Sequence, residues 1–214
     1  LNGDSSNNAI SATGTSGQTA SIIPGSSAPS LIIATGKNIS VDSGVNLTIQ
    51  SVIAGPSVVS KIGAGTLTLS GANTYAGATT ISAGTLNLTG NLAGGTAITI
   101  DGTGVFTQGA ASVISGSSSL TKNTADTTTL SGANTYTGAT TINAGTLNLT
   151  GNLTGGTAIT INGTGVFTQG AASVISGTSS LTKNTADTTT LSGANTYNGT
   201  TTVNAGTLAI GATQ

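Results

Sequence analysis

The side chains that could carry out acid–base or nucleophilic chemistry in this chain are few. Of 214 residues, four are lysine and five are aspartate, and histidine, cysteine, arginine and glutamate are absent. Without histidine there is no Ser–His–Asp triad, and without cysteine there is neither thiolate chemistry nor a disulfide framework. The remaining candidates for catalysis are Asp4, Asp42, Asp101, Asp126 and Asp187.

The spacing of the aspartates argues against hydrolysis. A glycosidase needs two carboxylates about 5–10 Å apart across one bond. Asp126 and Asp187 are equivalent positions 61 residues apart, which predicts about 10–15 Å between them in stacked coils. Asp101 is replaced by Asn162 in the next copy of the repeat. We therefore predict solvated turn aspartates, no catalytic residues and a protein that is not an enzyme.

Metal and cofactor sites are not predicted either. Calcium prefers six to eight oxygen ligands, several of them carboxylates, and the calcium-binding nonapeptide G-G-x-G-x-D is absent. Turn carbonyls near Asp126 could hold an adventitious ion at most.

The charge pattern excludes nucleic acid as a partner. A phosphate backbone is bound by many Lys and Arg side chains, whereas this chain has a net charge of −1 and only Lys37, Lys61, Lys122 and Lys183. No apolar run approaches the roughly 20 residues that a membrane-spanning helix needs.

The chain is organised by a 61-residue repeat. Ser70, Ser131 and Ser192 each begin a copy of SGANTY, and residues 70–130 differ from residues 131–191 at five positions. These are Ala76/Thr137, Ser82/Asn143, Ala93/Thr154, Asp101/Asn162 and Ser117/Thr178. A fixed internal period predicts an elongated repeat protein.

Short strands separated by glycine-rich turns are expected from Leu31 onward, because apolar and polar residues alternate there. In the second copy the expected strands are residues 139–143, 145–150, 157–162, 165–169, 172–176, 179–183 and 188–192. The expected inward residues are Ile142, Leu147, Leu149, Ile159, Ile161, Val166, Val174, Leu181 and Leu191.

This pattern predicts an all-β fold, a parallel β-solenoid with coils of roughly 20 residues. Each 61-residue block would then form two to three coils, and the chain about ten. Because aromatic residues make up only 2% of the chain, we expect an interior too thin for large rings. Residues 1–30 are either a mobile segment or a cap, and residues 31–214 form the array, with repeats 70–130, 131–191 and a partial repeat 192–214.

Residues 63–88, GAGTLTLSGANTYAGATTISAGTLNL, resemble the passenger-associated transport repeat of bacterial autotransporters. The family pattern G-x-G-x-L-x-L-S-G-x-N-T-Y-x-G-x-T-x-I runs through them, and the later copies match it from Ser131 and Ser192. Its central positions are Asn73, Thr74, Tyr75 and Gly77; Asn134, Thr135, Tyr136 and Gly138; Asn195, Thr196, Tyr197 and Gly199.

The resemblance implies a single-stranded right-handed parallel β-helix, secreted across the outer membrane and displayed at the bacterial cell surface. In that family the motif is associated with secretion and folding, so these residues are expected to be structural. The family's C-terminal membrane barrel has no counterpart before Gln214. The chain is therefore expected to be a passenger, a piece of one, or a stand-alone protein built from the same repeat.

Two binding surfaces are weighed. Tyr75, Tyr136 and Tyr197 could form an aromatic ladder for a glycan, but folding of each ring over its own turn is favoured. Threonine-rich strands, such as residues 66–68, 79–80 and 127–129, invite an ice-binding interpretation. Their positions look irregular from coil to coil, so ice binding and polysaccharide processing are the less favoured alternatives.

The preferred function is that of a non-enzymatic extracellular stalk or adhesin, with a host or matrix surface ligand as a possible partner. The alternative is a filament subunit. Residues 202–210 would leave an unpaired coil edge that templates further pairing, so end-to-end self-association is expected.

Overall fold

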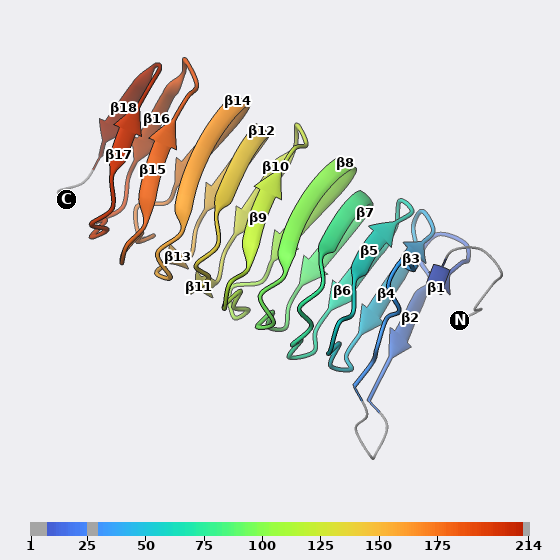
Figure 1. Ribbon diagram of the computed structural model, residues 1–214. Helices are drawn as coiled ribbons and strands as arrows, with labels where there is room; N and C mark the ends of the chain where they lie inside the picture. Colours follow the sequence, from blue (N-terminus) through green and yellow to red (C-terminus); the bar gives the residue numbers. More distant parts are fainter. Residues whose placement is uncertain (1–7, 25–29, 212–214) are drawn as a thin grey trace.

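The computed structural model describes residues 8–24 and 30–211, and this part of the chain contains strands and turns but no helix. It winds into a rod of stacked rungs that runs from the blue to the red end in Figure 1. Its strands are β1 (Asn8–Ala12), β2 (Thr19–Ile22), β3 (Asn38–Val41), β4 (Asn46–Ile49), β5 (Val59–Ile62), β6 (Thr66–Leu69), β7 (Thr79–Leu88), β8 (Ala97–Gln108), β9 (Ser119–Lys122), β10 (Thr127–Leu130), β11 (Ala133–Asn134), β12 (Thr140–Leu149), β13 (Asn152–Leu153), β14 (Ala158–Gln169), β15 (Ser180–Lys183), β16 (Thr188–Leu191), β17 (Thr201–Val203) and β18 (Thr207–Ile210).

Each rung has two long sides and one short side. The first long side carries β1, β3, β5, β9, β15 and β17, and the second carries β2, β4, β6, β10, β16 and β18. The longer strands β7, β8, β12 and β14 pass around the corner and serve both sides. Every strand pairing is parallel, and the strands make ten rungs, or about nine full turns. The predicted all-β parallel solenoid is confirmed.

The corner inside the longest strands depends on glycine. Gly84 in β7 and Gly145 in β12 have φ angles of 64° and 61°, in the left-handed region that other residues enter at a cost. The register of β7 on β8 and of β12 on β14 also shifts at this corner. The repeated Asn/Ser-Ala-Gly sequence therefore marks the place where the chain turns from one long side to the other.

One 61-residue repeat makes three rungs. Lys61, Ile81, Ile100 and Lys122 are partners in successive strands, which gives coils of 20, 19 and 22 residues. Equivalent residues of neighbouring copies therefore lie three rungs apart, or about 14 Å at about 4.8 Å per rung.

The third side of each rung is short. It consists of β11 paired with β13 and of single bridges such as Leu92 with Ile114 and Leu153 with Ile175. The strand expected over residues 172–176 is reduced to that bridge at Ile175. Few backbone groups therefore pair regularly on this side.

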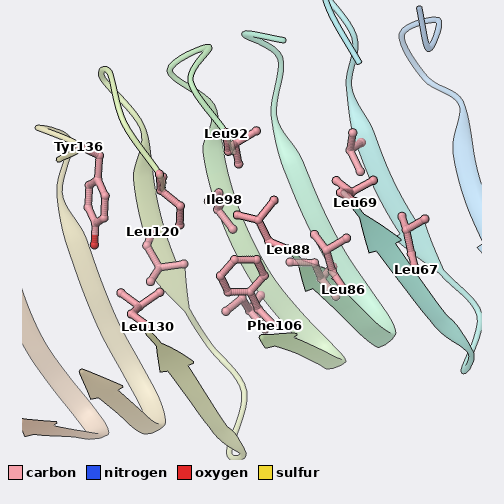
Figure 2. Close-up of a cluster of buried hydrophobic side chains, with 14 of the residues drawn as sticks. Leu67, Leu69, Leu86, Leu88, Leu92, Ile98, Phe106, Leu120, Leu130 and Tyr136 are labelled. Carbon is pink, nitrogen blue, oxygen red and sulfur yellow. The ribbon is translucent and has the colours of Figure 1, made fainter. Parts of the chain in front are cut away.

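Alternation decides which side chains enter the core. Leu147 and Leu149 are both 0% exposed, and Thr146 and Asn148 between and before them are half-buried. The inward placement of Ile142, Leu147, Leu149, Ile159, Ile161, Leu181 and Leu191 is confirmed. Figure 2 shows the equivalent column of leucines and isoleucines filling the rod in the first repeat.

The predicted inward placement of Val166 and Val174 is wrong. Both are half-buried, whereas their neighbours Phe167 and Ile175 are 1% and 2% exposed. Two adjacent apolar residues gave no alternation by which to choose between them.

The expectation of an interior too thin for aromatic rings is also wrong. Phe106 and Phe167 are 1% exposed, Tyr75 is 0% exposed and Tyr136 is 2% exposed. Figure 2 shows Phe106 and Tyr136 among the aliphatic side chains. The interior therefore accommodates whole phenyl rings.

Regular pairing begins before Leu31. β1 pairs in parallel with β3, and β2 pairs in parallel with β4. Within the segment assigned to a mobile region or cap, residues 8–22 therefore form the first rung of the same solenoid.

Candidate functional site

The asparagine of the N-T-Y-x-G motif lies inside the rod on its short side. The Oδ1 atom of Asn134 accepts a hydrogen bond from the backbone N–H of Ile114 at 2.9 Å. Its Nδ2 donates to the Gly132 carbonyl at 3.2 Å and to Gln108 Oε1 at 3.0 Å, and Gln108 Nε2 donates to its Oδ1 at 2.7 Å. A buried backbone group without a partner costs free energy, so this side chain replaces the strand pairing that the short side lacks.

The same arrangement recurs in the other copies. Asn73 Oδ1 accepts from the N–H of Ile53 at 3.0 Å, and Asn195 Oδ1 accepts from the N–H of Ile175 at 2.8 Å. Gln169 joins Asn195 as Gln108 joins Asn134. The motif asparagine therefore ties each copy to the rung that precedes it.

The motif tyrosine begins a buried chain of hydroxyl groups. Tyr136 Oη lies 2.7 Å from Thr140 Oγ1, which lies 3.1 Å from Thr157 Oγ1. Thr157 in turn donates to the Gly138 carbonyl at 2.7 Å. Burial raises the pKa of Tyr136 to about 12, so its hydroxyl stays protonated.

Tyr75 repeats this chain with Thr79, Thr96 and the Gly77 carbonyl. Because Tyr75 and Tyr136 are inside the rod, they cannot form a surface ladder for a glycan. Folding of each ring over its own turn is also an incomplete description, since the rings belong to the core.

The remaining motif positions divide between the core and the surface. A Cβ atom added at Gly77, Gly138 or Gly199 would overlap the carbonyl oxygen of Ser57, Ser118 or Ser179 in the preceding rung. Thr74, Thr135 and Thr196 are exposed. The motif therefore requires three of its four positions for packing between rungs.

Three lysines point into the rod, which the sequence analysis missed. Lys61, Lys122 and Lys183 are each 0% exposed and occupy the same position in successive copies. Lys122 Nζ donates to the Thr124 carbonyl at 2.8 Å, to Thr124 Oγ1 at 3.0 Å and to Asp126 Oδ1 at 2.9 Å. Lys183 makes the equivalent contacts with Thr185 and Asp187.

Lys61 has no carboxylate partner among these contacts. Its Nζ donates to the carbonyls of Ile62, Gly63 and Ala83 at 2.9, 2.6 and 3.1 Å. Burial lowers the pKa of Lys61 to about 8. The first copy thus neutralises its buried lysine in a different way from the later copies.

Asp126 and Asp187 are not simply solvated turn residues. Their side chains are 30% and 37% exposed, and each forms an ion pair with a buried lysine. Burial raises the pKa of Asp126, but hydrogen bonds from Thr124 and Lys122 outweigh it and hold that pKa below its usual range. The hydrogen bonds from Lys183 and Thr185 lower the pKa of Asp187.

No constellation for catalysis or metal binding is assembled in the described ranges. Asp101 accepts a hydrogen bond from Asn123 at 2.8 Å on the outer surface, and Asp126 and Asp187 lie three rungs apart. No group of three or more potential metal-ligating residues occurs among residues 8–24 and 30–211. Asp4 lies outside the described residues. No helix long and apolar enough to cross a membrane is present in the same part of the chain.

Comparison with known families is decisive for the motif. Three segments match the passenger-associated-transport-repeat family. They are residues 59–88, 120–149 and 181–210, which confirms the resemblance seen in the sequence. No curated protein matches the chain, and no solved structure matches it either.

The three passenger-associated transport repeats coincide with the same structural unit. Each begins just before a buried lysine, passes through the N-T-Y-x-G turn and ends on the second long side of the next rung. At 30 residues each they cover 90 of 214 residues. The family pattern therefore describes about one and a half rungs, held together by the asparagine, tyrosine and lysine contacts.

Proposed function

We propose that this chain is the rod-like part of a secreted, autotransporter-type passenger that acts as a stalk or adhesin at the bacterial surface and is not an enzyme. The observation that carries the proposal is the recurrence of three passenger-associated transport repeats at the same place in one continuous parallel solenoid. A host or matrix surface ligand is the partner that an adhesin of this type would have.

The architecture suits passage through a membrane as an extended chain. Each rung contacts only its neighbours, so a solenoid can nucleate at one place and grow rung by rung. The repeats carry the densest buried hydrogen-bond networks, namely those of Asn73, Asn134 and Asn195. We propose that these turns nucleate folding once they emerge.

Surface display tests this proposal. The chain is placed before a translocating outer-membrane barrel, and exposure is measured by antibody labelling and protease shaving of intact cells. We expect display of the parent, reduced display of Asn134→Ala and unchanged display of the control Thr135→Ala, whose side chain is exposed. A parent that remains in the periplasm, or equal effects of the two variants, would contradict it.

The non-enzymatic part of the proposal has its own assay. No pair of carboxylates in the described residues faces a common cavity, and the two depressions at Asp126 and Asp187 each contain one carboxylate that is bonded to lysine. We expect the purified chain to release no reducing sugar from a panel of polysaccharides. Hydrolysis that is lost in Asp126→Asn would overturn this part.

A filament subunit is the second candidate. Val203 and Ile210 in the rung of β17 and β18 are 44% and 51% exposed, and unpaired strand edges accept any strand that is offered, from the same polypeptide or another. Light scattering at rising concentration and electron microscopy test the candidate. Concentration-dependent rods support it, and monomers at high concentration exclude it.

A further inference from the structure

A continuous row of threonines runs along the first long side of the rod. Thr80, Thr99, Thr121, Thr141, Thr160, Thr182 and Thr202 are direct partners in seven successive rungs. The sequence-based impression that threonines are irregular from coil to coil is wrong for this side, because the 19-, 20- and 22-residue coils bring them into register.

The threonine hydroxyls of this row are available to a ligand. All seven side chains are half-buried and point outward. None of their hydroxyls hydrogen-bonds to another group in the described part of the chain. Each therefore offers one donor and two acceptor lone pairs.

A row of amides lies parallel to the threonines, two residues further along each strand. Asn123 Nδ2 donates to Asp101 Oδ1 at 2.8 Å, Asn143 to Asn123 at 2.8 Å, and Asn162 to Asn143 at 3.3 Å. Asn184 donates to Asn162 at 2.7 Å, and Asn204 donates to Asn184 at 2.6 Å. Because every amide is held by its neighbours, the row is preorganised. We call the two rows together the threonine–asparagine face.

This face is uncharged over five rungs, from Thr121 to Asn204. The lysines of the same strands, Lys122 and Lys183, alternate with these residues and point inward. At its near end Asp101 occupies the row, and Ser82 takes the equivalent place in the preceding rung. In the second copy both positions are asparagine, as Asn143 and Asn162.

The second long side of the rod is less regular and serves as a comparison. Its outward rows contain Thr85 and Thr146 but also Val105 and Val166. Some of its hydroxyls are already used, as in the bond from Thr168 to Asn148 Oδ1 at 3.0 Å. The threonine–asparagine face is therefore the more uniform surface.

We propose that the threonine–asparagine face binds ice. Its hydroxyls and amides form a planar grid, spaced about 4.8 Å between rungs and about 6.7 Å along each strand. Water oxygens on the faces of an ice crystal form a planar grid with similar spacings in two directions. Ordered waters bridging such a grid lose little further entropy, because a stack of hydrogen-bonded rungs is already rigid.

Two further features favour ice over other flat partners. Ammonium groups are strongly hydrated and would disrupt an ordered water layer, and this face keeps its lysines inside the rod. A crystalline polysaccharide is usually held by exposed aromatic rings, and none of the residues of the two rows is aromatic. The inference does not depend on surface display.

Two substitutions in one strand provide a matched test. Thr141→Lys places a charge on the threonine–asparagine face, and Thr146→Lys places the same charge on the other face of β12; both side chains are half-buried. Thermal hysteresis, inhibition of ice recrystallisation and partition into growing ice are measured for the whole chain. Circular dichroism verifies that each variant is folded.

We expect the parent to show all three activities, Thr141→Lys to lose them and Thr146→Lys to keep them. Asn143→Ser, which copies the natural Ser82, interrupts the amide row and should weaken partition into ice even if Thr141→Lys does not fold. An inactive parent would overturn the proposal, as would equal losses in the two lysine variants. Retention on cellulose or chitin without partition into ice would assign the face to a polysaccharide instead.

Discussion

The two partners of the Lys122–Asp126 ion pair should respond very differently to mutation. The ammonium is fully buried, whereas the carboxylate is 30% exposed at the rim of the same turn. Asp126→Asn leaves a buried positive charge with only the carbonyl and hydroxyl oxygens of Thr124 as partners. Lys122→Met removes the buried charge, and the carboxylate that remains can bond to water.

The magnitudes follow from this asymmetry. Removing one partner of a fully buried ion pair costs about 3–5 kcal/mol. Since Asp126 is partly exposed and Lys122 keeps two other acceptors, we expect Asp126→Asn to lower the free energy of unfolding by about 1–3 kcal/mol. Methionine has a flexible stem that fills the space of the lysine, so Lys122→Met should change that free energy by no more than about 1 kcal/mol.

Urea unfolding at pH 7, followed by circular dichroism, measures both changes. For a chain of this length, 1 kcal/mol corresponds to about 2–4 °C in Tm. Asp101→Asn is the control, because asparagine occupies the equivalent position 162, and it should stay within about 0.5 kcal/mol of the parent. If Lys122→Met were the more damaging variant, desolvation of the ammonium could not be the dominant effect, and the reasoning would be refuted.

Three further predictions concern the core. Burial lowers the pKa of Lys61 to about 8; the unfolded chain therefore binds the extra proton above that pH, and stability should rise by about 1–3 kcal/mol between about pH 8 and pH 10, an increase that Lys61→Met should abolish in pH-dependent urea unfolding. Leu147→Asp should lower stability by several kcal/mol because it buries an unpaired charge, whereas Thr146→Asp should be nearly neutral; similar melting of the two would show that the assigned faces are wrong. Asn134→Ala should lower stability by about 2–4 kcal/mol because it leaves buried donors and acceptors unpaired, and slow-exchanging amides near Ile114 should lose protection in hydrogen exchange.

The repeat, the all-β class and most inward residues could be predicted from the sequence, because strand alternation is a local property. The inward lysines could have been found in the same way. In Ser119-Leu120-Thr121-Lys122 the lysine alternates with the leucine, so both point to the same side. The expectation that charge belongs in solvent prevailed over this pattern.

The threonine–asparagine face could not have been predicted from local alternation. Its rows depend on which residues of successive rungs are partners, and the unequal coils of 19, 20 and 22 residues conceal that register in the sequence. The same limit applies to Asn134 and Gln108, which bond although they are 26 residues apart. Such contacts follow from pairing between rungs and leave no local signal.

The division of the 61-residue repeat into three whole rungs has a consequence for how such a molecule can change in length. Insertion of one further copy would displace everything beyond it by about 14 Å along the axis and would present the same side chains at each new junction. The row of amides, the buried lysines and the tyrosine contacts would all continue across the joint. Reach can therefore be altered by gaining or losing a copy, without any compensating substitution elsewhere in the rod.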